Sequence, residues 1–223
     1  MKIRVSAYGE YVLTLAGMSL ASLGLYAYGA LQNHELAYSY LVVNLFLAWL
    51  PLVFALRLTR VLGRKLWSSW EALGCSALWL VFLPNSFYMI SDFIHLQEAP
   101  RVDVLYDATM FTAFIFTGVA LGLSSLYLLH RQFRQRFRPR AVVGLLAFTL
   151  LVCSVAVYVG RDLRWNSWDI LINPGGLLFD LSDRLGHPAS YPAMSKTVLS
   201  FWLLLGGMYL LVWRASRLLR KAV

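Results

Sequence analysis

The chain has 223 residues, of which 59% are hydrophobic and only 14% are charged, and its formal net charge is +9. Too few polar residues remain to cover the surface of a soluble domain, so the composition excludes a soluble globular protein and indicates an integral membrane protein. The basic residues fall in short connections beside apolar segments. This placement favours contact with membrane lipids and argues against nucleic-acid binding.

Six apolar segments are long enough to cross a membrane, because a spanning helix needs about 20 mostly apolar residues. They cover residues 11–31, 38–58, 71–90, 104–129, 141–160 and 196–213. Their length and their lack of strict alternation favour helices over barrel strands. We therefore expect an all-α fold, a bundle of about six transmembrane helices forming a single domain over residues 1–223. The first segment is longer than a usual signal-peptide core, so we expect it to be an anchor.

The charged residues are divided unequally between the two sides of these spans. Fifteen of the twenty basic residues lie at the N-terminus, in the second and fourth connections and in the C-terminal tail. The positive-inside rule then places both termini in the cytoplasm. Nine of the eleven acidic residues lie on the opposite, outer side. We therefore expect the polar chemistry of the protein at its outer surface.

The third span carries polar residues where they are costly in a bilayer, namely Asn85, Tyr88, Asp92 and His95. On an α-helix these four fall within roughly 80° of one another and form a stripe about 15 Å long. Pro84 predicts a kink that exposes a backbone carbonyl one turn earlier. Simpler interpretations exist: Asn85 repairs the kink, Tyr88 is interfacial, and His95 only ends the helix.

Two other segments reach the same depth as this stripe. Asp103 and Asp107 open the fourth span, where Asp103 is expected to be a helix cap. The fifth span ends in basic and acidic residues, and we expect Arg161 or Arg164 to pair with Asp92 or Asp107. The predicted outward-facing pocket comprises Asn85, Tyr88, Asp92, His95, Asp107, Arg161, Asp162, Arg164, Asn166 and Asp169.

The fifth connection, residues 161–195, is the one long loop. Trp165 and Trp168 beside charged residues predict a short interfacial helix, broken at Pro174. The alternative is that both tryptophans belong to the aromatic belt of the membrane. A second short helix is expected over residues 177–185.

Two sequence motifs resemble a known family. LPNSFYMISDFIHL at residues 83–96 and GRDLRWNSWDIL at residues 160–171 resemble the bacterial predicted-membrane-protein family catalogued as domain of unknown function 1361. The resemblance covers about residues 67–172 and implies a multi-pass protein of the bacterial inner membrane. In the family pattern Ala-Pro follows the Pro-Asn pair, whereas Ser86 and Phe87 stand here, so a shared second kink is not expected. The family implies no activity.

One class of function is a binding protein or enzyme that holds a small polar or lipid head-group ligand in this pocket. Asp92 or His95 would then act as general base, and Arg161 or Arg164 would hold an anionic group. The sequence does not identify a cofactor, and a divalent metal held with Asp107 or Asp162 is the less favoured alternative. Asp92 and His95 come nearest to a metal-ligand pair and would need a further carboxylate.

Two other classes of function remain open. In a structural or accessory membrane protein, the polar cluster only fixes helix packing, and small residues allow close helix contact, namely Gly118, Gly122, Gly206 and Gly207. In a small transporter, a polar path would continue inward. The inner halves of the spans carry little for such a path beyond Asn44, Glu71 and Ser76. Neither a protein partner nor an oligomeric state follows from the sequence.

Overall fold

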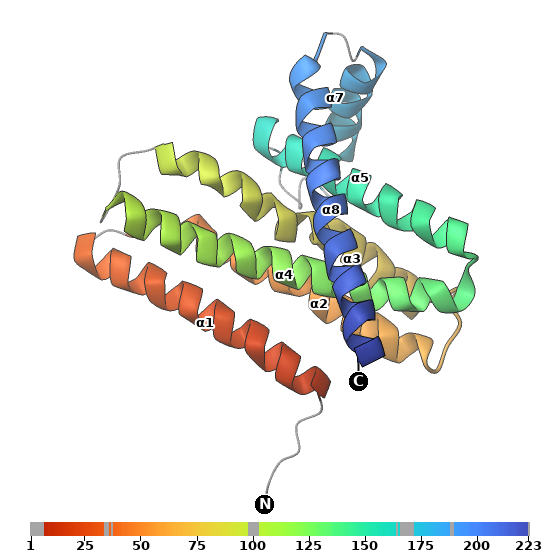
Figure 1. Cartoon of the computed structure of the whole chain (residues 1–223). Helices are drawn as coiled ribbons and strands as arrows, with labels where there is room; N and C mark the ends of the chain where they lie inside the picture. Colours follow the sequence, from red (N-terminus) through yellow and green to blue (C-terminus); the bar gives the residue numbers. More distant parts are fainter. Residues whose placement is uncertain are drawn as a thin grey trace, which may run out of the picture.

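The structure is a computed structural model, and it describes residues 7–33, 36, 38–97, 103–163, 165, 172–187 and 190–222. Every regular element in these residues is a helix (Figure 1). In chain order the helices are α1 (Ala7–Asn33), α2 (Ser39–Leu62), α3 (Trp70–Tyr88), the 3₁₀ helix η1 (Met89–Gln97), α4 (Val104–Arg136), α5 (Pro139–Asp162), α7 (Pro174–Gly186) and α8 (Pro192–Ala222).

Six helical segments in this part of the chain are long and apolar enough to cross a membrane, with α3 and η1 together forming the third. This confirms the expected all-α, multi-pass architecture. Local chemistry sets several of the boundaries, because a polar side chain satisfies a free backbone N–H at the start of a helix. Asp103 accepts from the backbone N–H of Tyr106 at 2.7 Å, as expected for a cap, and Ser69 and Asn173 begin α3 and α7 in the same way.

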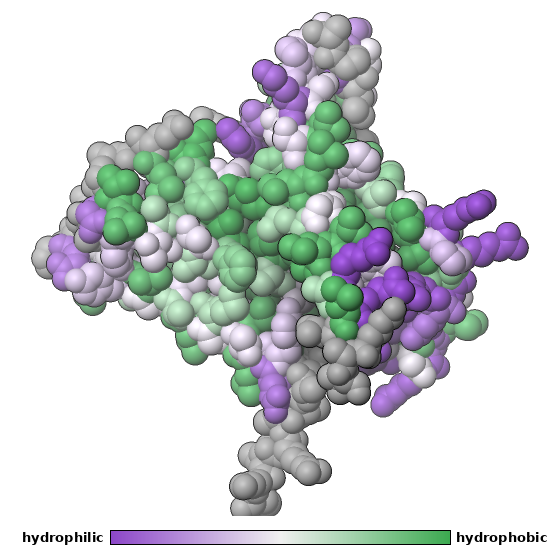
Figure 2. Space-filling view, in the orientation of Figure 1, coloured by the Kyte–Doolittle hydropathy of each residue, from purple (hydrophilic) through white to green (hydrophobic). Residues whose placement is uncertain are grey.

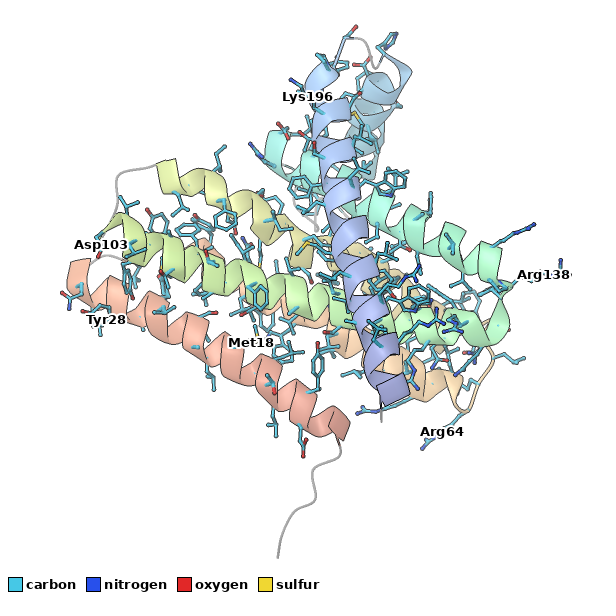
Figure 3. All side chains as sticks on the ribbon, viewed as in Figure 1. Met18, Tyr28, Arg64, Asp103, Arg138 and Lys196 are labelled. Atoms are coloured by element: carbon cyan, nitrogen blue, oxygen red, sulfur yellow. The ribbon has the colours of Figure 1, made fainter. Side chains whose placement is uncertain are left out.

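Helix α4 lies at the centre of the bundle, in contact with α1, α2, α3, η1 and α5 (Figure 1). Arg64 and Arg138 mark one end of the bundle, which we call the basic end, and Asp103 lies at the other, the acidic end (Figure 3). The basic end contains the α2–α3 and α4–α5 connections. Figure 2 shows hydrophilic surface concentrated at that end and an apolar surface over the middle of the bundle. Such a distribution suits a protein surrounded by lipid.

Neutral hydrogen bonds between side chains join the helices in the interior. Four of them pair a hydroxyl with an indole or with another hydroxyl, so these contacts join helices without burying a charge. The pairs are Tyr11 with Ser124 at 2.7 Å, Trp49 with Ser19 at 3.0 Å, Trp79 with Ser125 at 3.2 Å and Ser22 with Thr117 at 3.4 Å. The first span is thereby part of the bundle.

Two glycines of α4 allow α3 to approach closely. A Cβ at Gly118 would lie 3.2 Å from the Ser86 carbonyl oxygen, and one at Gly122 would lie 2.7 Å from the Ser86 Cβ. These two glycines therefore mediate the close helix contact expected of them. At Gly206 and Gly207 a Cβ would meet no described atom within 4 Å, so the same expectation is wrong for that pair.

Helix α8 crosses α4 and α5 obliquely in Figure 1 and packs mainly on α5. Its Trp202 indole donates to the Ala147 carbonyl at 2.9 Å. Only 11% of its most apolar window is buried, against 61% for α4, so most of α8 faces outward. Helix α7 confirms the short helix expected over residues 177–185. The interfacial helix expected around Trp165 and Trp168 lies largely outside the described residues.

Candidate functional site

The third span changes helix type within the polar stripe. The α-helix continues through Pro84 and ends at Tyr88, and the next nine residues form the 3₁₀ helix η1. The Ser91 hydroxyl donates to the Tyr88 carbonyl at 2.6 Å and satisfies an acceptor at this junction. The expectation of one continuous α-helix as far as His95 is therefore wrong. In a 3₁₀ helix residues three apart eclipse, so Asp92 and His95 line up directly.

A polar seam runs between α2 and the α3–η1 segment. We define the polar seam as Tyr40, Asn44, Ser86, Asp92 and His95. The rings of Tyr40 and His95 lie 5.1 Å apart, the Asn44 amide donates to Asp92 Oδ2 at 3.2 Å, and the Ser86 hydroxyl donates to the Ala48 carbonyl at 3.2 Å. The two segments run antiparallel, so the seam descends from the acidic end into the bundle.

Asp92 is the most unusual member of the polar seam. Its exposed fraction is only 3%, and burying a carboxylate costs several kcal/mol unless partners compensate. The hydrogen bond to it comes from a neutral amide, and His95, one 3₁₀ turn away, lies within electrostatic reach. His95 itself is half-buried. The seam thus connects a buried carboxylate with a titratable side chain nearer the acidic end.

Tyr88 connects this segment with the end of α5. Its ring covers Gly160, where an added Cβ would lie 3.1 Å from a ring carbon. Tyr88 is within electrostatic reach of Asp92, Arg161 and Asp162. The structure therefore brings these predicted site residues into one neighbourhood.

Other expectations about the site need correction or stay untested. Arg161 forms no ion pair with Asp92 or Asp107 and is exposed, as is Asp162. The Asn85 side chain donates to the Phe82 carbonyl of its own helix at 3.2 Å, not to the Leu80 carbonyl that Pro84 leaves without its usual donor. Asp107 is buried in the first turn of α4, at 3% exposure. The remaining predicted site residues, Arg164, Asn166 and Asp169, lie outside the described residues.

Sequence reasoning left three members of the polar seam out of the predicted pocket, namely Tyr40, Asn44 and Ser86. It placed Asn44 in the inner half of its span, which is wrong, because Asn44 pairs with Asp92 near the acidic end. The depth of Asn44 could have been read from the sequence, because Asn44 comes only five residues after α2 begins, at the end at which η1 finishes. That its side chain meets Asp92 depends in addition on the packing of α2 against η1.

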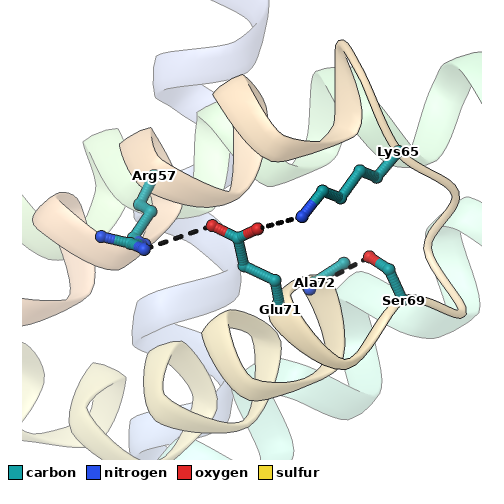
Figure 4. Close-up of polar contacts among 5 residues, drawn as sticks. All are labelled: Arg57, Lys65, Ser69, Glu71 and Ala72. Atoms are coloured by element: carbon teal, nitrogen blue, oxygen red, sulfur yellow. Dashed lines mark hydrogen bonds and ion pairs between the residues drawn. The ribbon is translucent and has the colours of Figure 1, made fainter.

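The basic end contains a separate group of charges. Glu71 pairs with Lys65 at 2.7 Å and with Arg57 at 3.2 Å (Figure 4). Both cations are more than half exposed, so this cluster is a surface ion-pair network. In the described part of the chain, no group of three or more His, Cys, Asp or Glu side chains is placed to hold a metal ion.

Comparison with known proteins identifies the family. A family model described as "Protein of unknown function (DUF1361)" matches residues 43–212, which is most of the chain. The chain belongs to the DUF1361 family. No curated protein and no solved structure matches it. The DUF1361 match extends well beyond the two motifs that first suggested it, from α2 to α8, and four of the five residues of the polar seam lie within it.

Proposed function

We propose that this DUF1361 protein lies in the bacterial inner membrane, with both termini in the cytoplasm, and binds a small polar or lipid head-group ligand at its outer, acidic end. The observation that carries the proposal is the burial of Asp92, which is 3% exposed and bonded to the neutral Asn44 amide. An ionisable side chain kept inside a membrane bundle usually serves a ligand, a proton or an ion.

The surroundings of Asp92 support a ligand that carries both an anionic and a donor group. Arg161 is exposed near Tyr88 and pairs with no described carboxylate, so its guanidinium is available for a phosphate or carboxylate. Asp92 would accept a hydrogen bond from a hydroxyl or amine of the same ligand. If the ligand reacts, Asp92 and His95 are the candidates for the general base.

The test compares the parent with Asp92→Asn and His95→Gln in lipid nanodiscs, by thermal unfolding and by native mass spectrometry. Both substitutions nearly preserve shape, so we expect stability to be retained while a co-purifying lipid or small anion is lost. Arg161→Gln should lose the same mass. Arg64→Gln, an exposed arginine at the basic end, is the matched control and should retain it.

A second function, that of a structural membrane protein, is favoured by the pairing itself. The Asn44–Asp92 hydrogen bond and the close contact at Gly122 both hold α3 in place. The double variant Asn44→Asp with Asp92→Asn reverses the pair and separates the two proposals. If the single variants melt the fold, nothing bound is lost, and the reversed pair restores stability, the polar seam is structural and the ligand proposal fails.

Transport has less support. Between Asn85 and the basic end, α3 presents the fully buried Leu83 and then Trp79, whose indole is bonded to Ser125. Glu71, at the far end of that helix, is held by two cations. These contacts fill the route that a polar substrate would need.

A further inference from the structure

A cavity lies at the basic end, between the C-terminal parts of α4 and α8. Its volume is about 470 Å³, and its walls include His130, Arg131 and Arg134 from α4 and Trp213, Ser216 and Arg217 from α8. This volume falls in the range of roughly 300–1,000 Å³ typical of small-molecule sites. It is at the opposite end of the bundle from the polar seam, so it is not part of the site proposed above.

Buried contacts hold the two walls of this cavity together. His130, only 6% exposed, shares a hydrogen bond of 2.6 Å with the Tyr209 hydroxyl of α8. The His130 ring also lies 5.7 Å from the Trp213 ring. The guanidinium of Arg217 lies 5.0 Å from the centre of the Trp213 ring, a cation–π distance that positions this cation at the cavity wall.

The charges around the cavity are all of one sign. Three arginines line it, no carboxylate does, and none of the three forms an ion pair with another described residue. Glu71, in the first turn of α3 at the same end of the bundle, is already bonded to Lys65 and Arg57. Unpaired arginines converging on one space favour an oxyanion that accepts several N–H groups at once.

The depth of the cavity indicates where that anion comes from. Helix α4 has 33 residues and is about 50 Å long at 1.5 Å per residue, whereas the hydrocarbon core is roughly 30 Å thick. The last turns of α4, HRQFRQR at residues 130–136, are polar and basic, so the excess length extends beyond the hydrocarbon at this end. The neighbouring α8 residues Leu210 and Leu211 are 51% and 71% exposed and face the space that acyl chains fill. The cavity thus has cations at head-group level and apolar surface beside it.

We infer that this cavity binds the phosphodiester head group of an anionic phospholipid. The phosphate lies among Arg131, Arg134 and Arg217, the Trp213 ring packs against the glycerol region, and the acyl chains run along α8. Basic pockets between transmembrane helices recognise anionic lipid in this way. The site is specific in position, unlike the general attraction of basic loops to a charged surface.

The test uses the full chain in nanodiscs of zwitterionic lipid, with and without an anionic phospholipid, and measures retained lipid by native mass spectrometry. Each basic side chain near an anionic lipid contributes on the order of fivefold to affinity. The variant Arg131→Gln/Arg134→Gln should therefore weaken retention of one anionic lipid about 25-fold. Arg138→Gln/Arg140→Gln removes the same charge from the same end outside the cavity, and it should change retention less than about threefold.

A third variant separates the shape of the cavity from its charge. Ser216→Phe fills part of the space and keeps every arginine, so it should also abolish retention of the lipid. The inference fails if both arginine pairs lower retention equally and Ser216→Phe has no effect, since general surface charge would then explain the binding. It also fails if inorganic phosphate stabilises the protein in zwitterionic nanodiscs and displaces the anionic lipid, since the ligand would then be a soluble anion.

Discussion

Replacing Gly122 by alanine should separate α3 from α4 at their closest contact. The added Cβ would lie 2.7 Å from the Ser86 Cβ and 3.0 Å from two carbons of the Phe87 ring, whereas ordinary contact begins at 3.4 Å. The Ser86 Cβ cannot rotate away, because it is fixed to the backbone. The Phe87 side chain is fully buried and has no room to turn. The two helices must therefore move apart by about 0.7 Å.

Overpacking of this kind typically costs about 1–3 kcal/mol. The better helix propensity of alanine offsets up to about 1 kcal/mol of this cost. We therefore expect the free energy of unfolding to fall by about 1–2 kcal/mol. Gly144→Ala in α5 is the matched control, because its Cβ would meet no described atom within 4 Å. The control should be neutral or slightly stabilising. The two variants then differ by about 1–3 kcal/mol, so their Tm values should differ by about 2–12 °C for a chain of this length.

The protein carries its own reporters for this experiment. Cys75 and Cys153 are free thiols with exposed fractions of 6% and 0%, so a thiol-reactive fluorescent dye should label them only on unfolding.

Gly118→Ala should lower Tm less than Gly122→Ala does, because the closest atom that its added Cβ meets belongs to the flexible Met89 side chain. Equal Tm values for Gly122→Ala and the control would refute the close-packing argument.

Two further predictions concern groups outside the bundle interior. The Tyr191 hydroxyl donates to the Asp183 carboxylate at 2.7 Å, and this hydrogen bond raises the pKa of Tyr191. The hydrogen bond therefore stabilises the folded state fully below the unfolded-state pKa of about 10. This stabilisation is lost as the pH rises through the folded-state pKa. Tyr191→Phe should therefore lower Tm at about pH 8, and the two Tm curves should converge at pH values above the folded-state pKa of Tyr191; parallel curves would contradict this. Glu71→Gln removes the exposed pairs with Arg57 and Lys65 and should lower Tm only slightly, because exposed ion pairs contribute little to stability. High salt should lower the stability of the parent by a similar amount and leave the variant unchanged, as measured by thermal unfolding.

Hydropathy was sufficient to predict the six spans and the short helix α7, because length and apolar composition depend on the bilayer and not on tertiary contacts. The change from α-helix to 3₁₀ helix at Met89 could not be predicted in the same way. It depends on the Ser91 hydroxyl binding the Tyr88 carbonyl and on the packing of Met89 against Gly118, a contact between separate helices. Helix periodicity alone therefore gave the wrong geometry for the end of this span.

The site could be predicted only in part for a similar reason. Asp92 and His95 attract notice because their polarity conflicts with an apolar span, but the partner of Asp92 follows from the pairing of α2 with α3, which single-sequence reasoning does not give. The basic-end cavity depends on the oblique path of α8 across α4. His130 beside Arg131, at the end of a predicted span, was the one sequence signal for it.

The contacts between α1 and α4 bear on how the chain assembles. Ser19 and Ser22 of α1 each donate to a carbonyl four residues earlier in the same helix, at 2.9 and 3.0 Å. Their partners elsewhere come much later in synthesis: Ser22 meets Thr117, 95 residues further along the chain. Before α4 has been synthesised, α1 therefore exposes no unsatisfied serine hydroxyl to lipid at these two positions, because each serine is bonded to a carbonyl of its own helix. At these two positions the helix can therefore enter the bilayer before its later neighbours are made.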